Sequence, residues 1–225
     1  MILTRTPMRV SLLGGWSDYP AHFVHHGGAV LGMAINKNVY IGVKRMPPGQ
    51  NLRYRVQYSK VDDCQSVDEI KHPAIRAALR YLNINEPLEF HVFADLPGRS
   101  GLGGSSAFAV GCLHALLRFR GQRPTPLDLG REAIAFEQFA IPEAVGCQDQ
   151  LFAALGGLQH IHFGAAGSVG QAVPIPAERL AELEASLVLV YSGSMRDAHR
   201  LAAQQIEAAP QNGADLEPLP RLANR

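Results

Sequence analysis

The sequence predicts a globular protein of mixed strands and helices, and three observations support this. A chain of 225 residues, 47% of them hydrophobic, can form a packed core. Short apolar runs that break at glycines, from Arg5 to about Val43, are typical of paired strands. Further along, segments with helical spacing of apolar residues alternate with compact apolar runs.

Each element is expected at a definite place. Leu52 to Tyr58 alternates polar and apolar residues, as a half-exposed strand does, and His72-Pro73 is a favourable helix start. After Gln205 the pattern fades, and residues 208–225 contain three prolines, so a poorly packed tail is expected. Further strands are predicted over residues 88–94 and 187–191, and helices over 74–82, 108–119, 127–139 and 148–155.

Charge and cysteine content exclude several classes of protein. Lys and Arg number 21 against 20 Asp and Glu, so no overall charge favours nucleic acid or an anionic membrane. The three cysteines are far apart and form no C-x-x-C pair, which favours reduced thiols. No signal sequence or membrane-spanning apolar run is evident. A cytoplasmic protein is therefore expected, and the sequence does not indicate its oligomeric state.

The most informative segment is the glycine- and serine-rich run of residues 97–107, which leads directly into a predicted helix. Glycines let backbone N–H groups converge, and a helix N-terminus adds partial positive charge, so this segment suits phosphate oxygens. It is not a P-loop, because Gly104 stands where the lysine belongs, and its glycines lack the spacing of a dinucleotide-binding fingerprint. Considered alone, the run also fits a flexible surface turn.

Three segments, in order along the chain, resemble motifs of the GHMP kinases, the family of galactokinase, homoserine kinase, mevalonate kinase and phosphomevalonate kinase. Residues 9–20 are similar to the N-terminal motif, residues 96–107 to the phosphate-binding motif, and residues 146–150 to the segment with the catalytic aspartate. Within the family, runs such as Gly27-Gly28-Ala29-Val30-Leu31 resemble bacterial D-glycero-D-manno-heptose 7-phosphate kinases. Residues 14–18 also resemble fucokinases.

The resemblance implies an α+β fold. Residues 1–180 would form a ribosomal-protein-S5-like N-terminal domain that binds ATP and sugar. Residues 181–225 would begin an incomplete, ferredoxin-like C-terminal domain with an irregular tail.

The implied activity is transfer of the γ-phosphate of ATP to the anomeric hydroxyl of a sugar or sugar phosphate, most closely D-glycero-D-manno-heptose 7-phosphate. Asp149 matches the catalytic aspartate that accepts or orients the proton of the attacking hydroxyl. Arg9 matches the basic residue beside it, which keeps the aspartate ionised. From the residues alone, Asp149 equally fits a helix N-cap before Leu151 to Leu155.

The resemblance also implies nucleotide and metal ligands. Ser105 would supply a hydroxyl and Glu137 a carboxylate to Mg²⁺, a hard ion that takes oxygen ligands. The alternative for Glu137 is a solvated helix face. The implied ATP-binding residues are Pro97, Gly98, Ser100, Gly101, Gly103, Gly104, Ser105 and Ser106.

Gly15, Ser17 and Asp18 match the sugar-binding positions, and a carboxylate that accepts hydroxyl hydrogen bonds is ordinary carbohydrate recognition. Trp16 fits either stacking on a sugar or packing in the core, and the core is favoured. The histidine pairs at 25–26 and 160–162 lack further ligands at metal-binding spacing, so ordinary strand or turn histidines are expected.

The sequence departs from the family pattern at three places. Arg99 replaces a usual glycine, and Gly104 replaces a common serine. The family's third, glycine-rich motif has no counterpart, which favours a truncated form with an open cleft. The alternatives are therefore a catalytically weak or inactive nucleotide- and sugar-binding protein, or a kinase for another sugar such as fucose or galactose.

Overall fold

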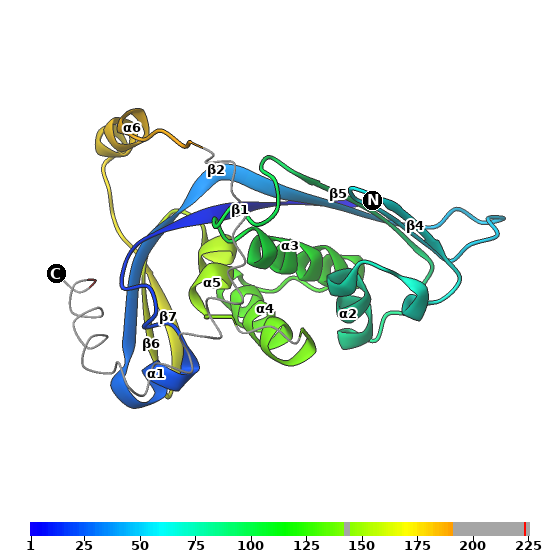
Figure 1. Cartoon of the computed structure of the whole chain (residues 1–225), viewed down its shortest axis with the longest axis horizontal. Coiled ribbons are helices and arrows are strands. Elements are labelled where there is room, and N and C mark those ends of the chain that lie inside the picture. The colour runs from blue at the N-terminus through cyan, green and yellow to red at the C-terminus, as the bar shows by residue number, and fades with distance from the viewer. Residues whose placement is uncertain (142–144, 191–222, 224–225) are drawn as a thin grey trace.

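A curved seven-stranded sheet forms one layer of the molecule, and the helices of residues 73–155 pack beneath it (Figure 1). The computed structural model describes residues 1–141, 145–190 and 223. Together the two layers make an α+β domain, which confirms the predicted fold class. The predicted C-terminal domain lies largely outside the described residues.

The sheet is organised around one long strand, β2 (Gly28–Arg45). Strand β1 (Ile2–Leu13) pairs with it antiparallel along most of its length. The other edge of β2 is shared, because its C-terminal half pairs with β5 (Leu88–Ala94) and its N-terminal half with β6 (Leu158–Gly164). The remaining strands are β3 (Tyr54–Gln57), which runs parallel to β5, β4 (Val61–Cys64) and β7 (Gly167–Ala172).

The central helix is α3 (Gly104–Phe119), which packs against β1 and β2. Gly111 permits this close approach, because a Cβ atom there would lie 2.7 Å from Thr6 Oγ1. Thr4 Oγ1 also donates to the Gly111 carbonyl at 3.0 Å. The other helices are α1 (Pro20–His26), α2 (Pro73–Tyr81), α4 (Pro126–Ala140), α5 (Gln148–Leu155) and α6 (Ala177–Ser186), with a 3₁₀ turn at Val67–Glu69.

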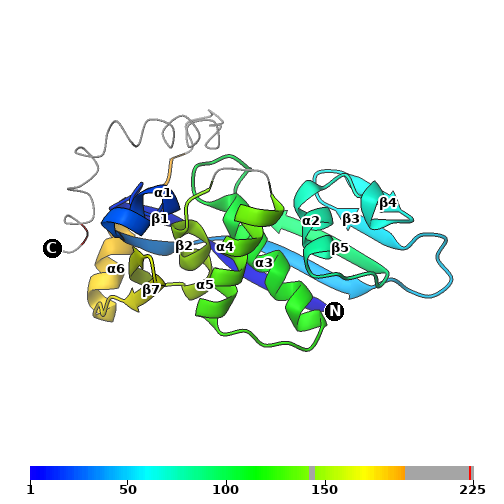
Figure 2. The same cartoon turned by 90° about the horizontal axis from the view of Figure 1, so that it is seen from below.

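Two apolar clusters hold the layers together. The larger one lies between the sheet and helices α2, α3 and α4. Figure 2 shows the arrangement of these helices from below. The smaller one joins α5 to β2 and β6 through Val30, Leu151, Phe152, Ile161 and Phe163. Since the apolar face of α5 is fixed in this second cluster, its polar N-terminus is held close to β1.

Most predicted elements are confirmed, two of them with the same bounds: the strand over 88–94 and the helix over 148–155. The strand predicted over residues 187–191 is wrong for its described part. Residues 187–190 have no regular structure, and each of the four side chains is more than half exposed. An apolar run becomes a stable strand only where a neighbouring strand takes up its backbone hydrogen bonds, and no described strand does so here.

The elements that were not predicted are α1, β4, the 3₁₀ turn at Val67–Glu69, β6, β7 and α6. The predicted domain division at residue 180 lies within α6 and stays a prediction, because residues 191–222 and 224–225 are outside the described part. None of the helices in the described part is long and apolar enough to cross a membrane.

Candidate active site

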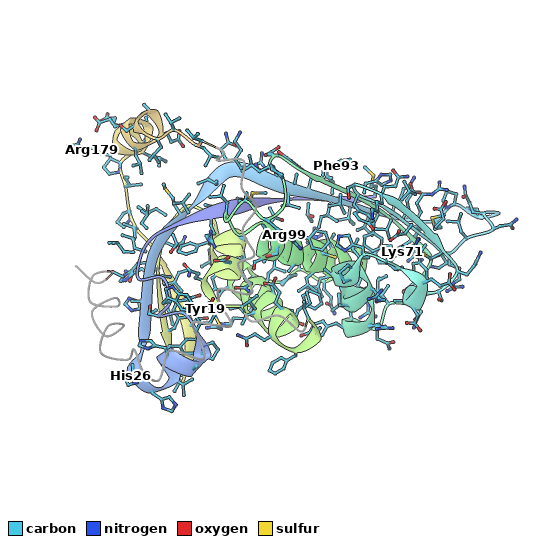
Figure 3. All side chains as sticks on the ribbon, in the orientation of Figure 1. Tyr19, His26, Lys71, Phe93, Arg99 and Arg179 are labelled. Carbon is cyan, nitrogen blue, oxygen red and sulfur yellow. The ribbon has the colours of Figure 1, made fainter. Side chains whose placement is uncertain are left out.

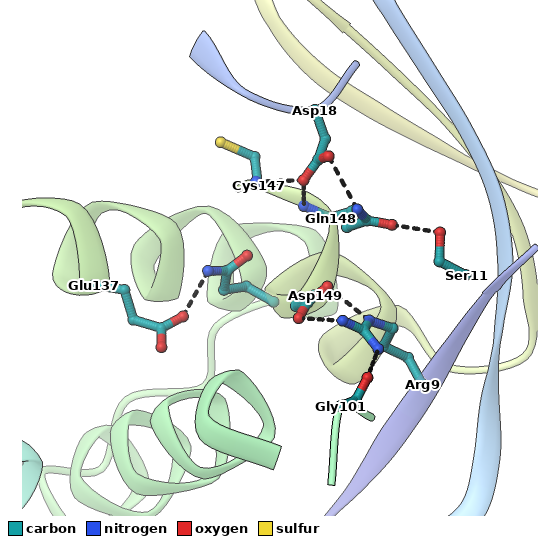
Figure 4. Close-up of polar contacts among 9 residues, drawn as sticks. Arg9, Ser11, Asp18, Gly101, Glu137, Cys147, Gln148 and Asp149 are labelled. Carbon is teal, nitrogen blue, oxygen red and sulfur yellow. Dashed lines mark hydrogen bonds and ion pairs between the residues drawn. The ribbon is translucent and has the colours of Figure 1, made fainter. Parts of the chain in front are cut away.

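Two residues 140 positions apart in sequence form the centre of the site (Figure 4). Arg9, on β1, donates from Nε and Nη2 to the two carboxylate oxygens of Asp149, each at 2.7 Å. The side chains are 16% and 23% exposed, so the pair is accessible from solvent yet partly shielded. Paired N–H···O bonds of this kind fix both the distance and the plane of the carboxylate.

The glycine-rich loop docks onto this pair. Arg9 Nη1 donates to the Gly101 carbonyl at 2.9 Å, and the Arg9 backbone N–H donates to the Leu102 carbonyl at 3.0 Å. Gly103 is the N-cap of α3 in the left-handed conformation, with φ of 72°, and an added Cβ atom there would lie 3.1 Å from Arg9 Cγ. The start of α3, with its partial positive charge, is therefore next to the Arg9–Asp149 pair.

The first turn of α5 connects three parts of the structure through three consecutive residues (Figure 4). Gln148 bonds to Ser11 of β1 and to Asp18, Asp149 bonds to Arg9, and Gln150 donates to Glu137 of α4. The N-cap of α5 is Cys147, and both oxygens of Asp149 are taken by arginine. The alternative that Asp149 acts as a helix cap is therefore wrong.

Asp18 is the most buried carboxylate of the site, with 1% of its surface exposed. Its Oδ2 accepts from the backbone N–H groups of Cys147 at 3.0 Å and Gln148 at 3.1 Å, and its Oδ1 accepts from Gln148 Nε2 at 2.9 Å. Burial, and secondarily the negative charge of Asp149, raises the pKa of Asp18 to about 6, although the backbone N–H groups act against this rise.

The other two predicted sugar-binding residues differ in their surroundings. Ser17 is 1% exposed, and its hydroxyl donates toward the carbonyls of Gly14 and Ala29 and accepts from the Ala29 N–H. Gly15 instead lines an open pocket of about 420 Å³. The roles of Gly15, Ser17 and Asp18 in sugar binding stay predictions, but only Gly15 faces this pocket.

The pocket at Gly15 has an aromatic wall and a polar side. Trp16 and Tyr19 stack with ring centroids 4.9 Å apart, and Ser11 and Gln148 line the same pocket, joined by a hydrogen bond of 2.7 Å. Trp16 belongs to neither apolar cluster, so the interpretation that it packs in the core is wrong. Such a mixture of aromatic faces and a few polar groups is typical of carbohydrate sites.

The two predicted magnesium ligands lie on neighbouring helices. Ser105 is exposed in the first turn of α3. Glu137 is 4% exposed on α4 and accepts from Gln150 Nε2 at 2.5 Å, so a solvated helix face is excluded for it. Within residues 1–141, 145–190 and 223, no three His, Cys, Asp or Glu side chains form a group that could hold a metal ion. One hydroxyl and one carboxylate nevertheless suit Mg²⁺ when phosphate oxygens and water supply the other ligands.

The predicted nucleotide-binding residues differ in how exposed they are to solvent. Arg99, at φ of 62°, is exposed on the loop and lies near the middle of the view in Figure 3. Ser106 is only 3% exposed, so its side chain is turned into the protein. Exposed or half-exposed positions are Pro97, Gly98, Ser100, Gly101, Gly103, Gly104 and Ser105.

Sequence reasoning missed Ser11, Tyr19, Gln148 and Gln150. Both glutamines flank Asp149 directly, so their position in the motif was an available signal. Ser11 lies two residues from Arg9 on a strand, and residues at this spacing point to the same face.

Residues 69–157 match the family model described as GHMP kinases N terminal domain. This part of the chain is thus similar to the N-terminal domain of the GHMP kinases. The GHMP kinase match includes the glycine-rich loop, Glu137 and Asp149, while Arg9 and Asp18 precede it in the sequence.

Curated relatives are sugar kinases of two kinds. The chain is 25% identical over 207 residues to D-glycero-alpha-D-manno-heptose 7-phosphate kinase of Campylobacter jejuni, an alignment that covers 88% of this chain and 61% of that protein. It is 26% identical over 219 residues to the bifunctional fucokinase/GDP-fucose pyrophosphorylase of Arabidopsis thaliana, which covers 87% of this chain and 20% of that protein. The chain thus spans less than two thirds of either relative.

A solved structure of a heptose phosphate kinase has the same fold. The D-glycero-D-manno-heptose 1-phosphate kinase from Bacteroides thetaiotaomicron superposes with a TM-score of 0.77 at 21% identity, over 96% of this chain and 74% of that one. At this identity the likeness establishes the shared fold.

Proposed function

We propose that the protein is an ATP-dependent sugar kinase that transfers the γ-phosphate of ATP to the anomeric hydroxyl of a sugar or sugar phosphate. The observation that carries this proposal is the contact between the Arg9–Asp149 pair and the glycine loop at the start of α3. A phosphate-binding element and an oriented carboxylate then lie within one group of contacts, as phosphoryl transfer requires.

The nucleotide phosphates would lie along residues 98–105. Backbone N–H groups of a left-handed glycine turn and of the first helical turn carry partial positive charge toward such a ligand. Gly101 and Gly103 adopt positive φ values of 80° and 72°, which glycine reaches without strain. This binding mode requires no lysine, in agreement with Gly104 at the position where a P-loop has one.

Asp149 would accept a hydrogen bond from the sugar hydroxyl and orient the hydroxyl oxygen toward the γ-phosphorus. In the transfer a bond forms between the hydroxyl oxygen and phosphorus, the bond from phosphorus to the β,γ-bridging oxygen breaks, and ADP leaves. The proton of the hydroxyl passes to Asp149 as the new bond forms. Arg9 holds the carboxylate in one plane through its two hydrogen bonds, so the rate depends on orientation more than on basicity.

Ser105 and Glu137 would hold Mg²⁺ together with the phosphates. Mg²⁺ bound there supplies positive charge to the phosphate oxygens. Gln150 would keep the Glu137 carboxylate oriented through its short hydrogen bond.

For the acceptor we favour D-glycero-D-manno-heptose 7-phosphate, bound at the pocket of Gly15 and Trp16 with its anomeric hydroxyl toward Asp149. Support comes from the heptose 7-phosphate kinase relative, of which the chain spans 61%. L-fucose is the second candidate, because the fucokinase relative matches at almost the same identity. A cytoplasmic location would be consistent with both.

The test is an assay of the protein with ATP, Mg²⁺ and a panel of heptose 7-phosphate, L-fucose and galactose, read by ³¹P NMR for an anomeric phosphate. We expect one acceptor to be phosphorylated, and Asp149→Asn to reduce kcat by roughly 10²- to 10⁴-fold. Asp63→Asn is the matched control, since Asp63 also accepts two hydrogen bonds from one arginine, Arg55, at 2.7 and 3.0 Å but lies elsewhere.

Absence of any transfer that depends on Asp149 would overturn the proposal. If calorimetry then detected ATP binding, the alternative of a nucleotide-binding protein without turnover would replace it.

A further inference from the structure

We propose that Arg99 is a nucleotide-binding residue whose guanidinium closes onto the terminal phosphates of ATP from the glycine-rich loop. The inference deepens the proposed kinase function and rests on it for the identity of the ligand. Two observations carry it: the charge that residues 97–107 offer to a phosphate, and the backbone conformation of Arg99.

The loop has a single charged side chain. Among residues 97–107 only Arg99 carries a charge, and the remaining residues are proline, glycine, serine, leucine and alanine. The terminal phosphates of ATP carry several negative charges, and a bound Mg²⁺ offsets only part of them. A guanidinium binds two phosphate oxygens at once through its fork of N–H groups. Arg99 is thus the side chain of this loop with the chemistry to neutralise the rest.

The other arginine of the site, Arg9, is already occupied by protein partners. Its Nε and Nη2 donate to the carboxylate of Asp149, and its Nη1 donates to the Gly101 carbonyl. Each of its three nitrogens therefore has a protein oxygen as a partner, and its charge faces the carboxylate. Arg9 orients Asp149, so neutralising the terminal phosphates falls to a different cation.

Arg99 has a backbone conformation that residues other than glycine rarely adopt. Its φ is 62°, and the only other positive values at non-glycine residues in the described part of the chain are those of Trp16 and Asn83. For a residue with a Cβ atom the left-handed region costs free energy, and such strain concentrates at ligand sites. Glycine would adopt this φ without strain. An arginine held there against its own preference indicates that its side chain has a role in the loop.

The loop leaves room for this side chain to move. Arg99 is exposed (Figure 3), and a Cβ atom added at Gly98 or Gly101 would have no other atom within 4 Å. The Cα atoms of Arg99 and Gly101 are at most about 7 Å apart, because two residues of extended chain span no more. Gly101 accepts the hydrogen bond from Arg9. The Arg99 side chain therefore begins close to the Arg9–Asp149 pair, on an open stretch of the loop.

Arg99→Gln and Arg99→Gly test the inference through nucleotide binding, measured by calorimetry without turnover. Glutamine removes the charge but keeps the strained backbone, whereas glycine removes both. We expect both variants to bind a non-hydrolysable ATP analogue roughly 10-fold more weakly. Affinity for AMP, which lacks the terminal phosphates, should change by less than about 2-fold. Arg99→Gly alone should melt at a higher temperature than wild type, because it relieves the positive φ.

Two exposed residues away from the site give matched controls. Arg123→Gln removes the same charge beyond the C-terminal end of α3, the end opposite to the glycine-rich loop. Asn83→Gly relieves a positive φ of 50° just after α2. Neither should change the affinity for the ATP analogue by more than about 2-fold, since exposed charges at a distance are screened. Asn83→Gly should nevertheless raise the melting temperature, as Arg99→Gly does.

An Arg99→Gln protein that binds the ATP analogue as tightly as wild type would overturn the inference and leave the kinase proposal intact. Equal losses for the ATP analogue and for AMP in both variants would also overturn it, because the loop itself would then be disturbed. If wild type binds the analogue but transfers no phosphate, the kinase proposal fails by itself, and the binding data still decide the role of Arg99. A wild-type protein that binds no adenine nucleotide would overturn both.

Discussion

Gly103 lies so close to Asp149 that a Cβ atom at position 103 would be 3.2 Å from Asp149 Oδ2. The proposed nucleotide loop and the proposed catalytic carboxylate are thus in direct contact. Glycine is required here for two reasons, the contact itself and the positive φ of 72°.

Gly103→Ala is therefore expected to reduce kcat/KM by roughly 10- to 100-fold, because the added methyl group displaces Asp149 or the loop. Gly121→Ala separates this effect from backbone strain: Gly121 has φ of 79° but nothing within 4 Å of an added Cβ. Steady-state kinetics and thermal melts of both variants make the comparison. Equal kinetic losses in the two would show that strain, not the contact, is responsible.

Arg9→Lys is expected to reduce kcat by roughly 10²-fold, since an ammonium group cannot bind both oxygens of Asp149 and the Gly101 carbonyl at once. The matched control is Arg55→Lys, which breaks a similar two-bond pair with Asp63 on the exposed side of β3. Kinetics should be affected only by the first substitution. An Arg9→Lys protein with normal kcat would contradict the view that the plane of the carboxylate limits the rate.

The elements that the sequence predicted well have local signals at their ends. The helix over 148–155 ends at Gly156, whose positive φ of 71° glycine adopts without strain. Leu88 to Ala94 is a compact run with strand-forming residues. Helix α1 has only seven residues, too few for a visible period. Its stability comes from tertiary contact, such as Phe23 stacking on Phe163 at 5.6 Å.

The site was less predictable than the fold. Arg9 and Asp149 were linked only by resemblance to a family, because no local pattern relates residues 140 positions apart. The side chain of Asp18 is equally suited to sugar hydroxyls and to backbone N–H groups. Its partners depend on burial at the start of α5, which is a property of the folded chain.

Trp16→Ala is expected to raise the KM for the sugar by roughly 3- to 10-fold and to leave the KM for ATP unchanged, because stacking of an aromatic face contributes about 0.5–1.5 kcal/mol. Phe93→Ala is the control: Phe93 is 58% exposed on the side of the sheet opposite the helices (Figure 3). An ATP effect without a sugar effect would place the acceptor elsewhere.

The stability of the protein should carry a pH signature of Asp18. Its pKa rises from 3.8 to about 6 on folding, so between these values the folded protein holds a proton that the unfolded chain has lost. The free energy of unfolding contributed by this group must then fall as pH rises through this range. At 1.36 kcal/mol per pKa unit, wild type should lose about 2 kcal/mol relative to Asp18→Asn between pH 4.5 and 7. Urea titrations of both proteins at the two pH values measure this difference.

Asp63→Asn gives the opposite sign, because hydrogen bonds from Arg55 lower the pKa of Asp63. Wild type therefore gains stability relative to this variant as pH rises. A difference between wild type and Asp18→Asn that stays constant with pH would mean that Asp18 is ionised throughout, held so by the N–H groups of α5.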